Sequence, residues 1–365
     1  MLLESLEAQN FRNLSGSISC RGGLNILLGE NGQGKTNWLE AICVLATSKS
    51  FKTARLQEAV RFGEDLGIVR GRVRASGEIR RDLQVALQGN TKALTVNGKK
   101  ETLQRYLGQL HAVVFNADEL EIVRGAPEAR RRFLDGGIVS IYPAFVQTLA
   151  DYGRVIKQKN SLLQTAQSEE YPLEKTAELL QPWNEQLAAL AARIHKARIR
   201  FVERLGEVLE KRLFGHEEVS IRYSSSLEGK GDLSDYAALI AERLKLRVQA
   251  EAVSGYSLVG PHRDDMEVLF DGHDLRKFGS SGQQRSALLL LQLANLSVYY
   301  SQHQEYPLFL LDDIDAELDY RRIGHLLEFL EGKTQTFVTT SKDSFAASFG
   351  AGSNTVKIEN GRALT

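Results

Sequence analysis

The sequence is poor in the residues that mark secreted, disulfide-bonded or zinc-stabilised proteins. Of its 365 residues only Cys20 and Cys43 are cysteines, too few for a disulfide framework and without the spacing of a zinc site. No apolar run approaches the roughly 18–20 residues of a membrane-spanning helix, and the first residues are acidic where a secretory signal is basic. These absences predict a cytoplasmic protein that does not contact a membrane.

An excess of charge of either sign is also missing. The 46 basic and 46 acidic residues cancel, so any contact with DNA must come from a local basic patch. An apolar content of 42% and a charged content of 25% are ordinary for a globular protein. The chain is long enough to form two compact lobes.

A glycine-rich loop lies between an apolar run and a helical pattern near the N-terminus. Leu24–Leu28 has the composition of a buried strand, and apolar residues recur at helical spacing over residues 38–46. Glycines let backbone N–H groups converge on a phosphate, and the helix N-terminus adds positive partial charge. Lys35 is expected to reach the terminal phosphates and Thr36 to ligate Mg²⁺. The residues predicted to hold a nucleoside triphosphate here are Gly29, Glu30, Asn31, Gly32, Gln33, Gly34, Lys35, Thr36 and Asn37.

Two carboxylates end a second apolar run. Residues 307–311 predict a buried strand that is followed by Asp312 and Asp313. Ionised carboxylates are costly in such a place unless a cation compensates them. Asp312 is therefore predicted to hold Mg²⁺, directly or through water, and Asp313 to orient or activate the attacking water. Structural acids held by hydrogen bonds are the alternative. Thr336–Thr340 predicts another buried strand, whose last threonines could sense the terminal phosphate.

A turn of serine and glycine opens a strongly apolar helix over residues 287–298. Ser280, Gly282 and Gln283 lie in this turn. A turn of this kind at a helix N-terminus can cradle phosphate. An ordinary N-cap, in which a serine accepts the first free N–H groups, is the alternative. The presence of the first loop favours the cradle.

Clusters of arginine supply the candidate DNA contacts. One follows a predicted strand face, and another opens a predicted helix at Pro127. A solvated surface is the alternative for both, and the second could also pair with carboxylates of a partner chain. Residues 193–200 carry further cations, most of them explained by a solvated helix face. The candidates for DNA phosphates are Arg70, Arg72, Arg74, Arg130 and Arg131.

The remaining pattern separates a strand-rich region from a helical one. Residues 1–28 predict three strands, residues 67–98 predict antiparallel strands with a turn at Asn97-Gly98, and residues 111–115 predict a buried strand. From Pro143 to Phe214 the pattern is helical, with breaks expected at Pro172 and Pro182. A strand near residues 219–223, a helix over about 232–250 and a hairpin at Asp271-Gly272 are expected to follow.

The order of these motifs resembles the ABC-type ATPase heads of SMC-like proteins, and within that group the RecF family of bacterial DNA replication and repair proteins. The resemblance covers essentially the whole chain and includes residues 11–14, 130–135, 260–265 and 311–319. The block Gly-Pro-His-Arg-Asp-Asp at 260–265 is particularly specific to the family. The resemblance implies an α/β fold with a mixed-sheet ATPase lobe, residues 1–115 and 303–365, and a largely helical lobe, residues 116–302, that carries the serine turn.

The resemblance also implies a mechanism based on ATP and Mg²⁺. Lys35, Thr36 and Asp312 would hold the nucleotide and metal, and Ser280 would contact the γ-phosphate bound to a second copy. Arg12, otherwise most simply a solvated residue, is counted with the nucleotide-binding residues. ATP would join a head-to-tail homodimer that clamps double-stranded DNA near single-strand gaps through phosphate contacts. RecF-like proteins work with RecR and RecO to help RecA load and to trigger the SOS response.

Several positions depart from the family pattern. Asn116 stands in a loop whose usual letters differ, so the residue that contacts Mg²⁺ and water is open, and the candidate catalytic residues are Asp313, Lys35 and Asn116. Thr339 and Thr340 replace the switch histidine of transporter ATPases. These departures suggest weak, DNA-stimulated ATP hydrolysis that acts as a switch. A transporter-type ATPase subunit and an ATP-gated scaffold without DNA binding are the alternatives.

Overall fold

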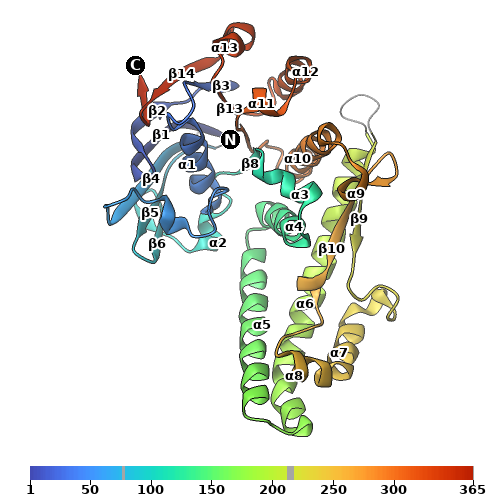
Figure 1. Cartoon of the computed structure of the whole chain (residues 1–365). Coiled ribbons are helices and arrows are strands. Elements are labelled where there is room, and N and C mark those ends of the chain that lie inside the picture. Colours follow the sequence, from blue (N-terminus) through green and yellow to red (C-terminus); the bar gives the residue numbers. More distant parts are fainter. Residues whose placement is uncertain (76–78, 212–217, 365) are drawn as a thin grey trace. The chain divides into compact units, whose positions relative to one another are not determined.

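The computed structural model describes residues 1–75, 79–211 and 218–364 and divides the chain into two units (Figure 1). One unit comprises Met1–Leu120 and Ser281–Thr365, and the other comprises Glu121–Ser280. The expected boundary at 302/303 differs from this division because α10 (Ser281–His303) packs on β8 (Ala112–Phe115) and so belongs to the first unit. None of the helices formed by the described residues is long and apolar enough to cross a bilayer.

An antiparallel sheet of the first unit has the strand order β2-β1-β4-β5-β6-β7. Its strands alternate buried and exposed side chains, as a sheet with one face on the core requires. The turn at Asn97-Gly98 joins β6 to β7, as expected. The bounds are β1 (Leu2–Phe11), β2 (Leu14–Ser19), β4 (Leu66–Arg74), β5 (Arg80–Gln88), β6 (Thr91–Val96) and β7 (Lys99–Lys100).

A second sheet of this unit has the order β15-β14-β3-β13-β12-β8, and its neighbours from β14 to β8 are parallel. The central strands β12 and β13 are buried along their whole length, which explains the unbroken apolar sequence of β12 and the β-branched and aromatic residues of β13. The bounds are β3 (Leu24–Leu28), β12 (Leu308–Leu311), β13 (Thr336–Thr340), β14 (Asn354–Glu359) and β15 (Arg362–Leu364).

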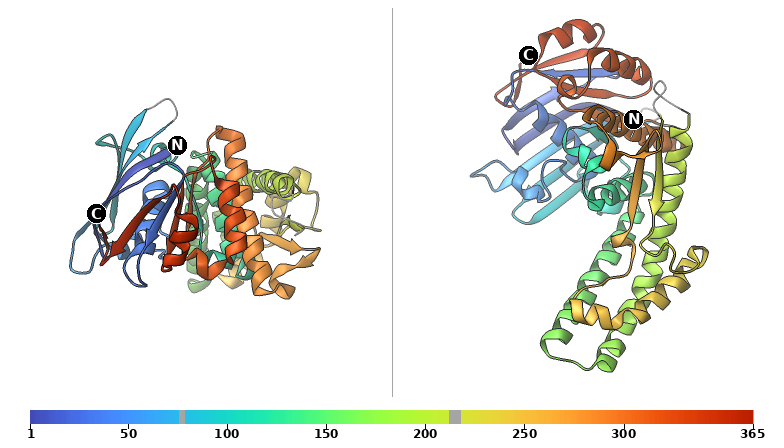
Figure 2. Two further views of the ribbon diagram at one scale, coloured as in Figure 1. Left: turned by 90° about the horizontal axis from the view of Figure 1, so that it is seen from above. Right: turned by 45° about the vertical axis from the view of Figure 1, so that its right-hand side comes forward.

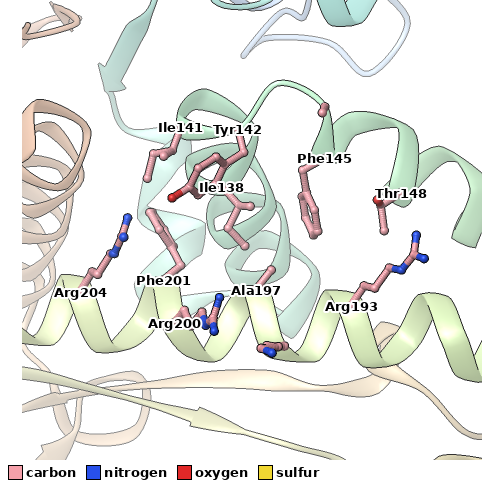
Figure 3. A pocket seen from close by; sticks show the side chains of 12 residues that line it. Ile138, Ile141, Tyr142, Phe145, Thr148, Arg193, Ala197, Arg200, Phe201 and Arg204 are labelled. Carbon is pink, nitrogen blue, oxygen red and sulfur yellow. The ribbon is translucent and has the colours of Figure 1, made fainter. Parts of the chain in front are cut away.

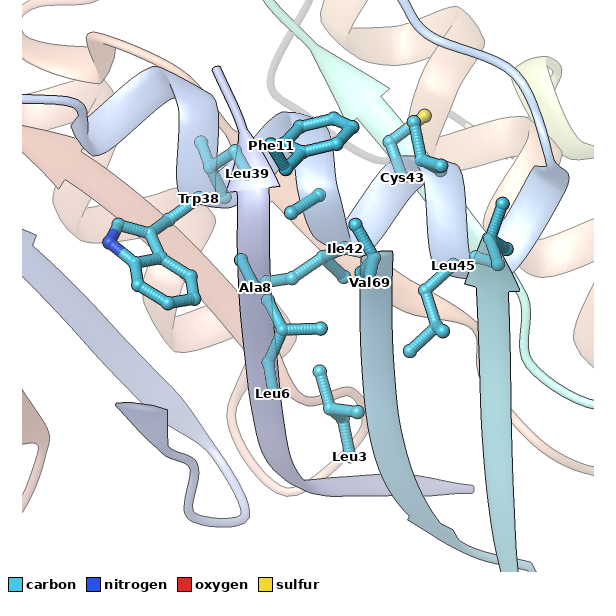
Figure 4. Packing of buried hydrophobic residues seen from close by; sticks show 14 of the residues in the cluster. Leu3, Leu6, Ala8, Phe11, Trp38, Leu39, Ile42, Cys43, Leu45 and Val69 are labelled. Atoms are coloured by element: carbon cyan, nitrogen blue, oxygen red, sulfur yellow. The ribbon is translucent and has the colours of Figure 1, made fainter. Parts of the chain in front are cut away.

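Helix α1 (Lys35–Thr47) occupies the core of the first unit. Trp38, Leu39, Ile42 and Leu45 are all 0% exposed, as expected of a helix that is apolar on nearly every side. They share one cluster with side chains of both sheets, including Leu6 of β1 (Figure 4). The other helical segments of the unit are η1 (Leu56–Ala59), α2 (Leu103–Tyr106), η3 (Asp118–Leu120), α11 (Ile314–Glu317), α12 (Tyr320–Leu330) and α13 (Asp343–Phe349).

The second unit is dominated by the packed pair α5 (Phe145–Ser168) and α6 (Leu173–Leu209), which lie side by side in Figure 1 and in the right-hand view of Figure 2. A small sheet of order β11-β10-β9 accompanies α6. The remaining bounds are α3 (Glu121–Arg124), α4 (Pro127–Ile141), β9 (Val219–Ser224), η4 (Leu233–Asp235), α7 (Tyr236–Leu246), α8 (Val248–Ser254), η5 (Pro261–Arg263), β10 (Asp265–Phe270), β11 (His273–Asp274) and α9 (Leu275–Phe278).

The helical region differs from its prediction at one proline. Pro172 caps the start of α6 as the expected break, but Pro182 lies inside the helix. Proline removes one backbone hydrogen bond, and here buried Leu180 and Leu187 on either side pack against α5 and hold the helix together. The helix expected over 232–250 is divided into η4, α7 and α8. The expected helix end at Phe214 lies outside the described residues.

Candidate functional site

The candidate site lies at the edge where parallel strands of the second sheet end together. Leu311 pairs with Phe115, and Thr340 pairs with Leu28, so the residues that follow these strands are neighbours. They include Gly29 of the loop, Asp312 and Asn116. In open parallel sheets the carboxyl edge is the usual place for ligands. The topology therefore brings the first loop and the acidic pair together, as the sequence predicted.

The glycines of the loop are required by backbone geometry. Gly32 and Gly34 have φ of 81° and 102°, which side chains disfavour. A Cβ on Gly34 would lie 2.9 Å from Asn13 Oδ1, and one on Gly29 would lie 2.3 Å from the carbonyl oxygen of Ile358. The loop is thus packed tightly against the chain on one side. Alanine at either position would force the loop to move.

The tip of the loop faces solvent. Glu30, Asn31 and Gly32 are exposed. Gln33 is anchored, since its side-chain Oε1 accepts the N–H of Asn360 at 2.6 Å. Three of the predicted positions thus present exposed groups, and the fourth fastens the loop to the turn after β14.

Lys35 begins α1 and is only 7% exposed. Its Nζ donates to the carbonyl oxygens of Gly29 at 2.8 Å and Glu30 at 2.9 Å, within the loop. The pKa of Lys35 is lowered because burial disfavours the ammonium form, an effect that the carboxylates of Asp313 and Asp312 oppose. The ammonium group is therefore held at the loop, where a phosphate chain would need it.

Asp312 is bound by two hydroxyl groups. Its Oδ1 accepts from Thr36 Oγ1 at 2.9 Å and from Thr339 Oγ1 at 2.7 Å. Burial raises the pKa of Asp312 above its ordinary 3.8, although both hydroxyls oppose the shift. Within the part of the chain that the structure describes, no ion pair to Asp312 occurs. A partly buried carboxylate beside a threonine hydroxyl is a set of hard oxygen ligands that suits Mg²⁺.

Thr339 also fixes the position of the second acid. Its Oγ1 accepts the backbone N–H of Asp313 at 2.8 Å, so one hydroxyl bridges both carboxylate residues. Asp313 is exposed and has φ of 49°, a left-handed conformation that strains a residue with a side chain. Its pKa is raised first by burial and then by the negative charges of Asp315 and Asp312. The sequence suggested Thr339 only as a phosphate sensor and gave no signal for this bridge.

Asn116 follows β8 beside the acidic pair. It is 4% exposed, and its Oδ1 accepts the N–H of Glu119 at 2.9 Å, which caps the short helix η3. Asp312 N donates to the carbonyl oxygen of Phe115 at 3.0 Å, so the two loops start from hydrogen-bonded strand ends. Asn116 thus lies at the edge of the sheet where β8 ends, and its side-chain oxygen caps η3.

Two of the residues predicted to bind the nucleotide, Arg12 and Asn37, form hydrogen bonds with other residues of the protein. Arg12 binds the fully buried Glu40 through Nε at 3.0 Å and Nη2 at 2.8 Å. Asn37 donates to Asn13 Oδ1 at 2.8 Å and accepts from Lys52 Nζ at 2.9 Å. Arg12 therefore fastens the β1–β2 turn to α1, a role that the sequence did not indicate.

The serine turn is exposed. Ser280, Ser281 and Gly282 face solvent at the start of α10, and Gln283 is partly buried. The next turn of α10 is tied to the segment after the acidic pair, since Arg285 Nε donates to Glu317 Oε2 at 2.8 Å. The turn is thus open to a ligand or a second molecule, and its helix is joined to α11.

The arginines of β4 are matched with acids on neighbouring strands. Arg72 Nε lies 3.1 Å from Asp82 Oδ1, and Arg74 Nε lies 3.3 Å from Glu4 Oε1. Arg70 donates to Gln84 at 2.6 Å and lies 3.9 Å from Glu7. The side chains of Arg70 and Arg72 are 48% and 58% exposed. This face is a ladder of mixed charge with accessible guanidinium groups.

The arginines of α4 have internal partners. Arg130 is 3% exposed and binds both carboxylate oxygens of Asp265, at 2.6 and 2.9 Å. Arg131 donates to the carbonyl oxygen of Asp264 at 2.8 Å. Arg198 of α6 binds Asp135 at 2.8 and 2.9 Å. Arg130 therefore binds the carboxylate of Asp265, a residue of the family-specific block 260–265, where the sequence predicted a DNA phosphate. This ion pair joins α4 to β10.

Metal chemistry at other places finds no support in the residues that the structure describes. They contain no group of three or more histidine, cysteine, aspartate or glutamate side chains that could hold an ion. A site with one carboxylate and one hydroxyl suits Mg²⁺ when phosphates complete the coordination. The Thr36 hydroxyl and the Asp312 carboxylate, 2.9 Å apart, are oxygen ligands of this kind.

The chain is similar to known proteins over nearly its whole length. A family model described as the RecF/RecN/SMC N terminal domain matches residues 2–363. The DNA replication and repair proteins RecF of Geobacillus thermodenitrificans and Bacillus mycoides are each 36% identical over 349 residues; the matches cover 93% of this chain and 93% and 92% of those proteins. A solved structure described as the recombination mediator protein RecF-ATP in RecFOR pathway has a TM-score of 0.89 and 31% identity, covering 100% of this chain and 97% of its own. An SMC head, 14% identical with a TM-score of 0.52, shares the fold.

Proposed function

The chain belongs to the RecF family, and from this membership we propose that it is an ATP-binding protein of DNA replication and repair whose contact with DNA depends on nucleotide-driven pairing of two copies. One observation carries the proposal: the Thr36 hydroxyl lies 2.9 Å from Asp312, at the sheet edge where the glycine loop holds Lys35. A cytoplasmic location goes with this role.

The chemistry of the site follows from the residues at this edge. Thr36 and Asp312 would hold Mg²⁺, which would neutralise phosphate charge. Lys35 would exchange its loop carbonyls for phosphate oxygens. Asp313, with its raised pKa, is suited to accept a proton from water or to orient it, and the Thr339 hydroxyl keeps its backbone in place.

Pairing of two copies is supported by the exposed serine turn. Ser280 and Gly282 lie at the N-terminus of α10 and are exposed to solvent. A γ-phosphate bound to a second copy would complete this cradle. Arg285 of α10 is hydrogen-bonded to Glu317, in the segment that follows Asp313. Loss of the γ-phosphate at the start of α10 would therefore change the position of that segment. Slow hydrolysis would then release the pair.

Contact with double-stranded DNA is assigned to the exposed arginines. Arg70 and Arg72 have partly free guanidinium groups that could exchange carboxylates for phosphates without sequence preference. Arg130 and Arg131 support the fold of the helical unit instead. Relatives are described as members of a RecFOR pathway. The proposal therefore extends to RecR and RecO as partners, to loading of RecA at gaps and to support of the SOS response.

The test measures ATP binding and hydrolysis with and without Mg²⁺ and duplex DNA. Asp312→Asn should lose Mg²⁺-dependent binding, and the exposed control Glu328→Gln on α12 should keep it. Duplex DNA should stimulate hydrolysis by the wild type. A rate of ATP hydrolysis that does not change when DNA is added would favour an ATP-gated scaffold without DNA binding. The arginines of β4 are paired with acids, so this alternative needs the test.

A further inference from the structure

A cavity of about 520 Å³ lies in the helical unit between the end of α4, the start of α5 and the middle of α6 (Figure 3). Its floor is apolar, since Ile138, Ile141 and Phe201 are each 3% exposed. The floor is closely packed, because a Cβ on Gly137 would lie 2.2 Å from the ring of Phe201. Tyr142, at the rim, is 48% exposed. The cavity is therefore an apolar depression with fixed walls.

Four cationic side chains of α6 border the cavity. They follow at intervals of three and four residues and so share one helix face: Arg193, Lys196, Arg200 and Arg204. None of the four makes an ion pair or hydrogen bond with any residue in the described ranges. Arg198 of the same helix shows the contrast, because it binds Asp135 in two places.

Like charges one helical turn apart destabilise a helix unless something compensates them. Glu203 lies on the same helix but does not line the cavity. Glu207 follows Arg204 by three residues and does not line the cavity either, so a row of positive charge borders the apolar depression. This combination is complementary to a ligand that carries both acidic and apolar groups, and the cavity has the size of ordinary ligand pockets, about 300–1,000 Å³.

An extended nucleic acid fits this surface less well than a peptide does. Bases bind to exposed aromatic faces. Here Phe201 is buried and two aliphatic side chains complete the floor, so the rings that a base could reach are those of Tyr142 at the rim and the partly buried Phe145. A leucine or phenylalanine side chain of a peptide would bury apolar surface in the depression while neighbouring aspartates paired with the cations.

We infer that this cavity between α4, α5 and α6, called the groove from here on, is a docking site for an acidic peptide segment of a partner protein, which an apolar side chain of the peptide anchors. This surface lies within one unit and uses no residue of the nucleotide site. It is therefore independent of the function proposed above, and either can fail without the other.

The experiment uses the full chain without nucleotide. A fluorescein-labelled peptide of alternating aspartate and leucine serves as the probe, and fluorescence anisotropy at low salt gives its affinity. Saturable binding is expected. The double variant Arg200→Glu with Arg204→Glu should weaken it about tenfold or more, and the gentler Arg200→Gln with Arg204→Gln should weaken it less. The matched control reverses exposed lysines elsewhere in the unit, Lys157→Glu on α5 and Lys245→Glu on α7.

Two further probes decide between kinds of ligand. A peptide with serine in place of leucine should bind more weakly, because the apolar floor then has no occupant. An oligothymidylate should bind without dependence on Arg200 and Arg204. The inference is overturned if the serine peptide binds equally well, if the control variants lose as much affinity as the groove variants, or if the oligonucleotide alone depends on these arginines.

Discussion

The two Asp–Asp pairs of this chain lie in opposite surroundings. At the start of β10, Asp265 is bound through both oxygens by Arg130, and the fully buried Asp264 accepts from Tyr223 Oη and Ser226 N. At the end of β12, the side-chain partners of Asp312 among the described residues are the hydroxyls of Thr36 and Thr339. The first pair thus has a guanidinium bonded to it, whereas Asp312 forms no ion pair with any residue that the structure describes.

This difference separates structure from function. A buried carboxylate with its guanidinium is complete, and removing it leaves an uncompensated charge. A partly buried carboxylate that has hydroxyl donors and no bonded cation is less favourable in the folded protein, and a bound cation would relieve it. The comparison therefore predicts that substitutions in the two pairs have opposite signatures, one in stability and one in activity.

The largest effect on stability is expected from Asp265→Ala. It leaves Arg130 buried without its partner, so the free energy of unfolding should fall by about 3–5 kcal/mol. Urea denaturation measures the loss. The double change Arg130→Met with Asp265→Leu should recover much of it, because no charge is then left buried. A loss of less than about 1 kcal/mol for Asp265→Ala would mean that this ion pair is not structural.

Asp312→Asn should give the opposite result. ATP hydrolysis should fall about a hundredfold, because the metal loses its carboxylate. Without nucleotide the free energy of unfolding should stay the same or rise, since a buried charge without a cation is removed. Steady-state hydrolysis and urea denaturation of the same preparation measure both. A stability loss like that of Asp265→Ala would make the two pairs equivalent and refute the comparison.

The pH dependence of stability sharpens the same contrast. The folded state raises the pKa of Asp312 above 3.8, so the native protein holds this proton to a higher pH than the unfolded chain does. The contribution of Asp312 to the free energy of unfolding is therefore fully present below its ordinary pKa, and it is lost as the pH rises through the raised pKa of the folded state. The stability of Asp312→Asn relative to the wild type should therefore increase as the pH rises through this range. An advantage that is equal at all pH values would contradict the assigned pKa.

Thr339→Val should have a smaller effect. It removes one hydrogen bond to Asp312 and leaves the N–H of Asp313 without its acceptor, a loss of about 1–3 kcal/mol. Activity should fall as well, because Asp313 is no longer held. Thr339→Ser keeps the hydroxyl and serves as the control. If serine and valine behave alike, the bridge between the two acids has no energetic role.

Arg72→Gln should have the smallest effect on stability, about 0.5 kcal/mol or less, because its ion pair with Asp82 is exposed. If β4 contacts DNA, duplex affinity should fall and its salt dependence should weaken by about one charge. Filter binding at several salt concentrations measures both. Unchanged affinity and salt dependence would remove this strand from the DNA surface.

The parts of the site that follow from local chemistry could be predicted from the sequence. The glycine loop, Lys35, Thr36 and Asp312 each depend on a strand, a turn and a helix that leave clear patterns, and the family resemblance gave the class of protein. Asn116 is a candidate because of the family resemblance, and the buried strand predicted before it is β8.

What could not be predicted depends on partners distant in the chain. Nothing next to Arg130 in sequence indicates Asp265, and nothing next to Arg12 indicates Glu40, so an internal ion pair and a DNA contact have the same local pattern. Thr339 bridges two acids only because β13 and β12 are neighbours in the sheet. Pro182 stays helical because of packing on α5, which local propensity does not contain.

The most direct test of the composite nucleotide site is sedimentation with ATP and duplex DNA. The wild type should dimerise with ATP and not with ADP, and Lys35→Met and Ser280→Arg should each stay monomeric. Mixed together, the two variants should dimerise again, because one intact loop then faces one intact serine turn. If ATP leaves the wild type monomeric on DNA, or if the mixture is as inert as its components, Ser280 does not act on the nucleotide of a second copy.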